Sequence, residues 1–371
     1  MSGSIYNDPG NTCNELLDYC LRGDPWPSDL LDRALAIDEG RAFLSIVVER
    51  LGDLFEPRLV DVYKRLFRQV IERVAPEIVP RLRSSQFSEP PKSAAKVYVL
   101  SRVTLGADIA VTSVMLVAMK RRYPGAQIVF VGPRKSYEMF QADPRISHMD
   151  APYARNGSLA ERLRASARLW FDDGIVIDPD SRLTQLGLIS VCDESRYFWF
   201  QSRSLPGGRL SEIAAAWAKS TFGVDARPYI APLPAKGEPA EITVSLGVGE
   251  NESKRLGGDF ERELMRLLAG KSVLVDKGGS AAERERVEQA ILPGMRTHDG
   301  SFASFAAEIS RSKLYIGYDS SGGHVASACD VPAICIFTGA VSERFVHRWR
   351  PLGRIVRDRQ EALAAISSAL S

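Results

Sequence analysis

The spacing of hydrophobic positions divides the chain into a helical region and a region of alternating strands and helices. Between about residues 12 and 82, apolar residues recur every three or four positions, which is the pattern of helices with one buried face. Prolines at positions 57, 76 and 80 punctuate this stretch, so about four helices are expected. Residues 84–95 are small, polar and proline-bearing, which is typical of a linker. The pattern therefore predicts an all-helical N-terminal region over residues 1–90.

After the linker, short β-rich runs alternate with helical runs. A strand over residues 97–100, a helix over 108–122 and a strand over 127–131 form a βαβ unit, which belongs to a parallel sheet. The same alternation restarts near residue 241, after a proline-rich stretch. The fold class is therefore α/β, with successive domains over residues 96–236 and 237–371.

Composition and charge are those of an ordinary globular protein. Hydrophobic residues make up 45% of the chain, and 48 basic side chains balance 46 acidic ones, so no nucleic-acid partner is expected. The five cysteines are scattered and lack a CxxC spacing, which argues against a disulfide framework or a zinc site and favours a reducing compartment. The sequence shows neither a signal peptide nor a run of about 20 apolar residues. A cytoplasmic protein is expected, and peripheral contact with the inner membrane stays open.

A loop late in the chain has the composition of a phosphate-binding turn. It follows a strand predicted at residues 314–317 and leads into a helix, whose N-terminus would present backbone N–H groups and a positive dipole end. Serine hydroxyls and a histidine ring could add donors. From spacing alone, a plain capped turn is about equally compatible with this sequence. The loop consists of Asp319, Ser320, Ser321, Gly322, Gly323 and His324.

The loop after the first predicted strand of the first domain ends at Asp108. It lies at the carboxyl end of the sheet, where α/β folds bind ligands. An aspartate that faces a cleft there can act as a general base toward an incoming hydroxyl. The alternative is that Asp108 only caps the next helix.

Residues 247–255, between the first strand and helix of the second domain, form a polar loop that ends in Lys254 and Arg255. A lysine at this edge can neutralise a departing diphosphate without a metal ion. The alternative is that both cations are simply solvated.

Taken together, these loops resemble those of glycosyltransferase family 9, the ADP-heptose:lipopolysaccharide heptosyltransferases. That family shows an Arg-x-x-x-x-Gly-Asp first loop, a Ser-Lys-Arg middle loop and an Asp-Ser-Gly-x-x-His late loop. This chain has 102–108 (RVTLGAD), 253–255 (SKR) and 319–324 (DSSGGH) in the same order. The similarity covers about three quarters of the chain, from residue 96 to the end.

The resemblance implies a GT-B architecture, in which two Rossmann-like domains face each other across a cleft. It implies an inverting, metal-independent glycosyltransferase with no cofactor. Such an enzyme moves a sugar, here the heptose of ADP-heptose, to a hydroxyl of a glycan, glycolipid or other acceptor. In that scheme Asp108 is the catalytic base, Lys254 stabilises the leaving phosphates, and the loop from Asp319 to His324 binds the donor, with Gly322 and Gly323 supplying backbone N–H groups.

The acceptor would lie against the first domain, where Arg102, Thr104 and Arg182 are the candidate binding residues. Arg182 and Arg203 could hold an anionic acceptor. The alternative is that such arginines form ion pairs within the domain.

The sequence departs from the family's pattern at three places. Gly106 lies two residues before Asp108 instead of immediately before it. Ser321-Gly322-Gly323 stands where the family commonly has Gly-Pro and a variable residue, and Leu256 replaces a tryptophan. The particular sugar, the nucleotide base and the acceptor are therefore left open.

Two other functions fit the same motifs. A non-catalytic protein could bind a sugar nucleotide and use the helical region to dock a protein partner. A GT-B-like epimerase would act on the sugar nucleotide alone. A dinucleotide oxidoreductase ranks lower, because no G-x-G-x-x-G follows the opening strand of either domain.

Overall fold

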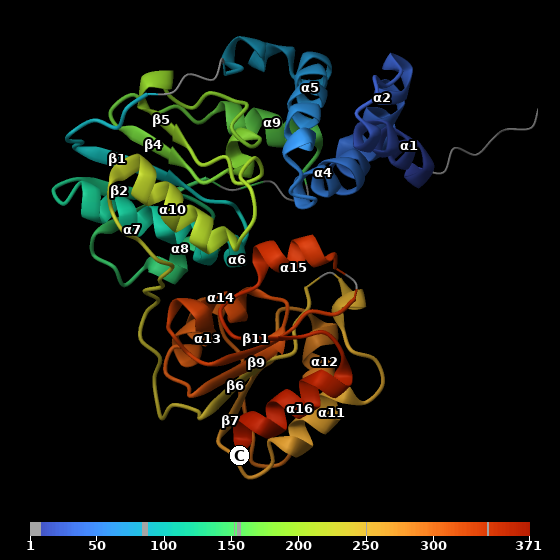
Figure 1. Cartoon of the computed structure of the whole chain (residues 1–371), viewed down its shortest axis with the longest axis vertical. Coiled ribbons are helices and arrows are strands. Elements are labelled where there is room, and N and C mark those ends of the chain that lie inside the picture. The colour runs from blue at the N-terminus through green and yellow to red at the C-terminus, as the bar shows by residue number, and fades with distance from the viewer. Residues whose placement is uncertain (1–8, 84–87, 152, 154–156, 250, 340) are drawn as a thin grey trace, which may run out of the picture.

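The computed structural model describes residues 9–83, 88–151, 153, 157–249, 251–339 and 341–371. These form a helical region and two domains that each contain one parallel sheet (Figure 1). Residues 84–87 of the predicted linker lie outside the described ranges. Among the described residues, no helix is long and apolar enough to cross a membrane.

The helical region is built on amphipathic helices, as the hydrophobic spacing predicts. The longest helix begins at Pro57, where the missing N–H of proline costs nothing and its fixed φ suits the first turn. A π-helical stretch, Leu44–Val48, joins two short helices into one bent element. The helices are α1 (Pro9–Arg22), α2 (Ser28–Ala36), α3 (Arg41–Phe43), α4 (Glu49–Asp53) and α5 (Pro57–Val74), followed by a 3-10 turn at Pro76–Arg81.

The first domain is Rossmann-like. Its strands lie in the order β3-β2-β1-β4-β5, and every pairing is parallel. Alternate residues of β1 feed separate apolar cores on the two faces of the sheet. The strands are β1 (Lys96–Leu100), β2 (Gln127–Gly132), β3 (Ile146–Asp150), β4 (Ile175–Asp178) and β5 (Tyr197–Trp199), and the helices are α6 (Leu105–Ala107), α7 (Ser113–Arg122), α8 (Arg134–Tyr137), α9 (Leu159–Ala167) and α10 (Leu210–Phe222).

The second domain repeats this design with a wider sheet. Its strand order is β11-β10-β9-β6-β7-β8, again with parallel pairings throughout. The strands are β6 (Ile242–Ser245), β7 (Val273–Asp276), β8 (Arg296–His298), β9 (Leu314–Tyr318), β10 (Ala333–Ile336) and β11 (Arg354–Val356). The helices are α11 (Phe260–Leu267), α12 (Ala281–Ala290), α13 (Phe302–Ile309), α14 (Ser321–Ala328), α15 (Glu343–Trp349) and α16 (Arg359–Leu370).

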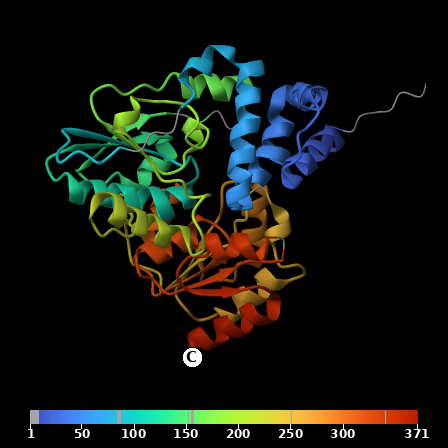
Figure 2. The ribbon, with the colours of Figure 1, turned by 45° about the horizontal axis from the view of Figure 1, so that its top comes forward.

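The helical region lies beside the first domain (Figure 2), and the two share an apolar core. Leu159 and Leu163 of α9, and Leu186 in the loop after β4, are buried among the side chains of α1 to α5. Arg83, which is buried, pairs with Glu194 at 2.6 Å and lies 3.8 Å above the centre of the Tyr197 ring. The helices are therefore an integral layer of the first domain.

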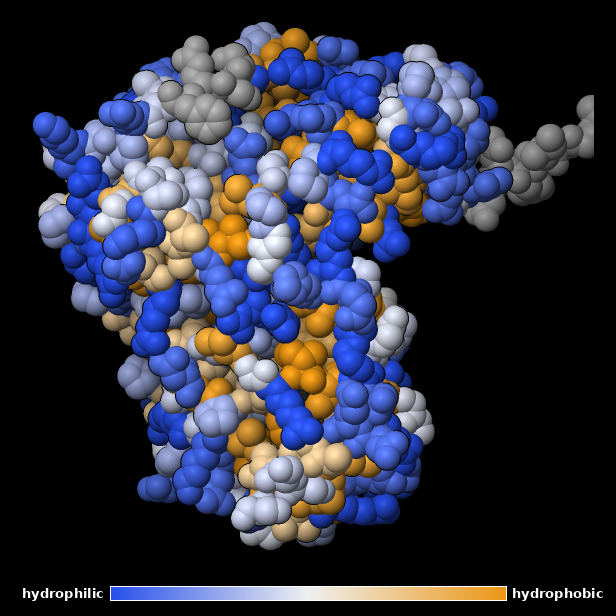
Figure 3. Space-filling model, viewed as in Figure 1, coloured by the Kyte–Doolittle hydropathy of each residue, from blue (hydrophilic) through white to orange (hydrophobic). Residues whose placement is uncertain are grey.

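The carboxyl ends of the two sheets face each other. The N-terminal half of α14, from the second domain, packs against α6 of the first. A Cβ atom added at Gly106 would lie 3.1 Å from Cδ2 of His324, so the two segments are in close contact. The surface is indented between the helical region and the second domain (Figure 3). This arrangement brings the predicted first and late loops together.

Candidate active site

The late loop is the start of helix α14, which packs very closely on the sheet beneath it. The helix begins at Ser321, so it includes four of the six residues of the predicted loop. A side chain at position 322 would collide with the Tyr315 ring, and a Cβ at position 323 would lie 2.8 Å from Cys335 Sγ. The two glycines are therefore required by packing, in addition to any role of their N–H groups.

The N-terminus of α14 offers hydrogen-bond donors. The first N–H groups of a helix have no partner within the helix, and they carry the positive end of its dipole. Ser320 occupies the N-cap position, but its side chain makes no capping hydrogen bond within the described part of the chain. The half-buried hydroxyls of Ser320 and Ser321 flank these N–H groups. An anion fits this end of the helix.

Lys254 reaches the same place from the second domain's first loop. It ends a 3-10 turn, Glu252–Lys254, and its Nζ lies 2.8 Å from Asp319 Oδ2. The Lys254 and Asp319 side chains are 20% and 10% exposed. A hydrogen bond of 3.3 Å from Thr338 Oγ1 to the Ser253 carbonyl holds the turn against the end of β10. The structure thus joins two predicted residues in a partly exposed ion pair.

Arg255, the neighbouring cation, has a structural role. Its guanidinium donates to the Leu246 carbonyl and to Glu261, both at 2.7 Å, and it also pairs with Glu252. Its side chain is 7% exposed. The expectation that both cations are solvated is wrong for Arg255, which anchors the loop that presents Lys254.

His324 lies at the junction of the two domains. Its ring packs edge-on against Trp349 of α15, with 6.1 Å between the ring centres, and faces Gly106 on its other side. Burial lowers the pKa of His324 to about 4, against the opposing influence of the Asp319 carboxylate. The imidazole is therefore neutral at pH 7 and can offer a hydrogen bond, but no positive charge, to a ligand.

Asp108, expected to face the cleft, is buried in the structure, and its assignment as the catalytic base stays a prediction. Its side chain is fully buried, and its oxygens accept hydrogen bonds from the Ser101 hydroxyl at 2.6 Å, the Arg102 N–H at 2.7 Å and the Thr112 hydroxyl at 2.7 Å. Burial raises the pKa of Asp108, while these hydrogen bonds oppose the shift. Asp108 holds the loop after β1 in place.

A wider turn of helix begins at Asp108. It is a π-helical turn that ends at Thr112, and such turns are frequent at functional sites. The spacing from Arg102 to Asp108 is that of the family's first loop, and only the glycine is displaced.

The loop held by Asp108 is strained and partly covered. Val103 has φ of +63°, a conformation that is rare for a β-branched residue and that clusters at functional sites. Arg102 is buried, donates to the Pro179 carbonyl and to Ser202, and lies 5.6 Å from the centre of the Trp349 ring. Burial lowers the pKa of Arg102 to about 10. Thr104, by contrast, is exposed.

The helical region covers Arg182 and Arg203, the remaining acceptor candidates. The sequence did not indicate this contact. Arg182 and Arg203 both lie against Gly52 of α4, where an added Cβ would stand 3.0 Å from Arg182 Nη2 and 3.3 Å from Arg203 Nε. Arg203 donates to the Gly52 carbonyl at 3.0 Å and pairs with buried Asp180 at 2.7 Å. The predicted alternative of an ion pair within the domain is therefore confirmed for Arg203.

The turn between α4 and α5 reaches both domains. Phe55 is 2% exposed and has φ of +50°. Its ring meets Trp349 edge-on at 6.2 Å, with the Arg203 and Arg348 guanidiniums 5.9 and 5.5 Å from its centre. Arg344 of α15 pairs with Glu56 at 3.0 Å. Phe55 thus contacts Trp349, the ring that packs on His324.

Metal ligands do not gather at this site. Throughout the described ranges, no three His, Cys, Asp or Glu side chains lie close enough to hold a metal ion. The candidate ligands for an anion at this site are Lys254 and the start of α14.

Comparisons with known proteins identify solved structures that share this fold. No protein-family model and no curated protein sequence matches the chain. Among solved structures, the Escherichia coli heptosyltransferase WaaC with ADP-2-deoxy-2-fluoro heptose is 15% identical, with a TM-score of 0.55 over 74% of this chain and 100% of that one. E. coli ADP-heptose LPS heptosyltransferase II is 16% identical, with a TM-score of 0.52 over 74% and 99%.

A glycosyltransferase of family 9 from Veillonella parvula is 16% identical, with a TM-score of 0.53 over 76% of this chain and 90% of that chain. These likenesses, together with the paired parallel sheets, show that the chain has the GT-B fold. The predicted fold class is confirmed, including the helical region. The resemblance to family 9 found in three sequence motifs thus extends to the three-dimensional structure.

Proposed function

We propose that this chain is a glycosyltransferase that uses a nucleoside-diphosphate sugar as donor. The observation that carries the proposal is the meeting of Lys254, Asp319 and the N-terminus of α14 at one point of a GT-B fold. An ammonium and a set of oriented N–H groups suit a diphosphate, and Asp319 can accept hydrogen bonds from sugar hydroxyls. ADP-heptose is the first donor to test, because structures with the same fold bind ADP or an ADP-heptose analogue.

The reaction would join the acceptor to the sugar in one displacement with inversion, without a metal ion. The acceptor oxygen bonds to the anomeric carbon and passes its proton to water, while the bond from that carbon to the diphosphate oxygen breaks and its electron pair stays on the diphosphate. Negative charge grows on the leaving diphosphate, so Lys254 and the α14 N–H groups would stabilise the transition state more than the ground state. A hydroxyl of a glycan, glycolipid or other acceptor is the proposed nucleophile.

One observation favours a second function, in which the chain binds a sugar nucleotide without transferring the sugar. Asp108, the expected base, is fully buried and saturated with hydrogen bonds. We assign it a positioning role. Incubating the chain with ADP-heptose and a hydroxyl acceptor separates the two functions, because only a transferase yields ADP together with a glycosylated product.

Binding of the donor is tested by calorimetric titration with ADP, GDP, UDP and their sugars. Lys254→Met should weaken binding of the preferred nucleotide by roughly tenfold or more, since a hydrogen bond to a charged group contributes about 1.5–3 kcal/mol. Lys313→Met is the matched control. Lys313 directly precedes β9, at the opposite end of the same sheet, and its side chain is 78% exposed. Equal affinity of the two variants, or no binding of any nucleotide to the unaltered chain, would overturn the proposal.

A further inference from the structure

The turn between α4 and α5, residues 54–56, sends one side chain out of its own region. The other buried apolar side chains described between residues 9 and 83 belong to the core that the helices share with α9. Phe55 belongs instead to the apolar core that runs through both Rossmann-like domains, and it is 2% exposed. The helical region therefore places one aromatic ring in the junction between the two domains.

The backbone of this turn is strained. Phe55 has φ of +50°, in the left-handed region, which bulky side chains rarely adopt. Such residues persist only where the surrounding structure holds them, and they occur in switch regions and ligand clamps. The contacts of the ring, rather than a local backbone preference, therefore keep the turn in place.

The Phe55 ring stands between groups from the two domains. On the side of the first domain, the Arg203 guanidinium lies 5.9 Å from its centre. On the side of the second domain, the Arg348 guanidinium lies at 5.5 Å and the Trp349 ring at 6.2 Å. Trp349 in turn packs on His324 in the first turn of α14. The ring therefore fills space between the domains, next to the proposed donor site.

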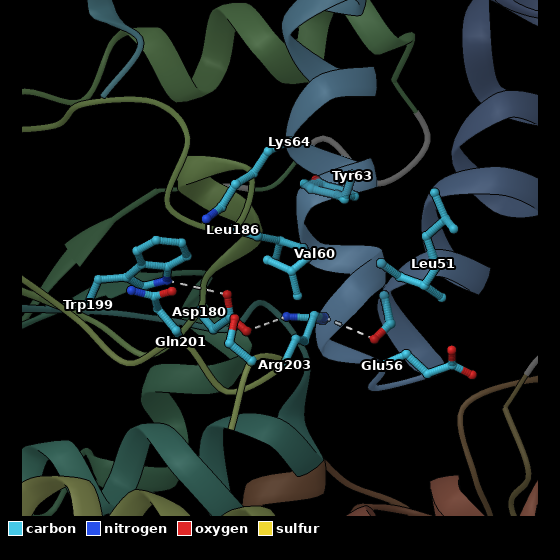
Figure 4. A pocket seen from close by; sticks show the side chains of 13 residues that line it. Leu51, Glu56, Val60, Tyr63, Lys64, Asp180, Leu186, Trp199, Gln201 and Arg203 are labelled. Atoms are coloured by element: carbon cyan, nitrogen blue, oxygen red, sulfur yellow. Dashed lines mark hydrogen bonds and ion pairs between the residues drawn. The ribbon is translucent and has the colours of Figure 1, made fainter. Parts of the chain in front are cut away.

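The surface beneath the turn carries an excess of positive charge. Arg203 pairs with Asp180 and donates to the Gly52 carbonyl (Figure 4). Arg182, against the same glycine, has no carboxylate partner among the described residues, and the Arg102 guanidinium donates only to a carbonyl and a hydroxyl there. Burying charge that is not paired is costly. Such a surface is therefore expected to be uncovered in another state of the protein.

Few polar contacts hold the turn on the second domain. Arg344 of α15 pairs with Glu56 at 3.0 Å and donates to the Leu54 carbonyl at 3.3 Å. The two charged side chains are 52% and 26% exposed, and ion pairs this exposed contribute little. The rest of the helical region is anchored on α9 through its own core. The turn can therefore leave α15 while the helices stay on the first domain.

We propose that the α4–α5 turn is an autoinhibitory plug. In the seated state, the Phe55 ring fills the acceptor side of the cleft and the turn covers Arg203. When the turn withdraws, both become accessible. The word acceptor rests on the proposed function, whereas the covering of Arg203 does not.

The first test measures how often the plug withdraws. Arginines of the whole chain are labelled with phenylglyoxal and mapped by mass spectrometry, and Arg203 should react far more slowly than exposed Arg354. Phe55→Ala should speed the labelling of Arg203 by roughly tenfold or more, because it removes the buried ring that anchors the turn. Phe260→Ala, in the separate core of the second domain, controls for lost stability and should leave this labelling slow.

A milder variant avoids the loss of a buried ring. Arg344→Gln removes the ion pair and the hydrogen bond to the turn, and should speed the labelling of Arg203 roughly threefold. Arg354→Gln is the matched control, because Arg354 is an exposed arginine of the same domain, and it should leave the labelling unchanged.

The second test follows the release of ADP from ADP-heptose with water as the acceptor. The water oxygen bonds to the anomeric carbon and gives a proton to the solvent, while the diphosphate leaves with the electron pair of the broken bond. Phe55→Ala and Arg344→Gln should speed this release by factors similar to those for labelling, because withdrawal of the plug lets water reach the donor.

Three results overturn the proposal. They are equal labelling of Arg203 and Arg354 in the unaltered chain, equal labelling of Arg203 in Phe55→Ala and Phe260→Ala, and slower release of ADP by both Phe55→Ala and Arg344→Gln. Failure of the proposed function looks different. If no variant releases ADP while labelling follows the expected order, the proposed function falls and the covering of Arg203 by the plug stands.

Discussion

The two domains face each other with the carboxyl edges of their parallel sheets, but the polar groups on these two edges differ in burial and in hydrogen bonding. In the second domain, Lys254 and Asp319 form a partly exposed pair beside a helix N-terminus whose serine makes no capping hydrogen bond in the described chain. In the first domain, Asp108, Asp178 and Asp180 are all buried and hydrogen-bonded, and α4 of the helical region contacts Arg203, the partner of Asp180. The polar groups at the edge of the second domain are partly accessible to a ligand, whereas those at the edge of the first domain are already bonded within the protein.

This difference assigns separate tasks to the two edges. Buried groups whose hydrogen bonds are already satisfied do not readily exchange them for a ligand, so their role is to hold the backbone in place. Groups in an accessible ion pair can trade a carboxylate for a phosphate at small cost. We therefore expect substitutions at the first edge to act mainly on stability, and those at the second edge to act mainly on nucleotide affinity.

The largest effect is expected at Phe55, where the helical region touches both domains. Phe55→Ala removes a buried ring and should lower the free energy of unfolding by about 3–5 kcal/mol, measured by urea denaturation. The loss should also loosen Trp349 and let water reach His324. NMR titration should then show the pKa of His324 rising from about 4 toward its ordinary value.

Phe67→Ala is the control for this prediction. Phe67 is fully buried in the helical region and should cost a similar amount of stability without moving the histidine. If the His324 titration is the same in Phe55→Ala as in the unaltered chain, the helical region does not influence the donor side of the cleft.

A smaller effect is expected at Asp108. Asp108→Asn leaves the Ser101 hydroxyl without its acceptor and should lower the free energy of unfolding by about 1–3 kcal/mol. Nucleotide affinity should be unchanged. Asp173→Asn, on an exposed carboxylate of the same domain that pairs with Lys96, should cost under about 1 kcal/mol. Asp108→Asn with full stability and lost turnover would restore Asp108 as the base.

The sequence predicted the fold because its signals were local. Apolar periodicity separated the helices from the alternating strands, and three loops at strand ends indicated where the sheets present ligand groups. Lys254 and the start of α14 lie close together, since the loop that carries Lys254 follows β6 and α14 follows the neighbouring strand β9.

The features that the sequence did not reveal depend on packing between distant segments. The contact of Phe55 with Trp349 joins residues 294 positions apart, and no local pattern encodes it. The burial of Asp108 depends on hydrogen bonds from Ser101, Arg102 and Thr112, and no local pattern indicates it. A motif fixes which residues are near a site, whereas their orientation depends on the helix that carries them.

The smallest effect compares serine caps on the two domains. Ser158 caps α9 in a capping box, accepting from the Glu161 N–H at 3.2 Å, whereas Ser320 makes no such bond within the described residues. Ser158→Ala should therefore cost about 1 kcal/mol in thermal denaturation, and Ser320→Ala a few tenths. With ADP present the order should change, because Ser320→Ala alone removes a donor from the proposed phosphate site and so loses part of the stabilisation by the nucleotide. If both variants lose the same stability in the absence of nucleotide, Ser320 is an ordinary helix cap. The two edges would then not differ in the hydrogen bonding of their serine caps.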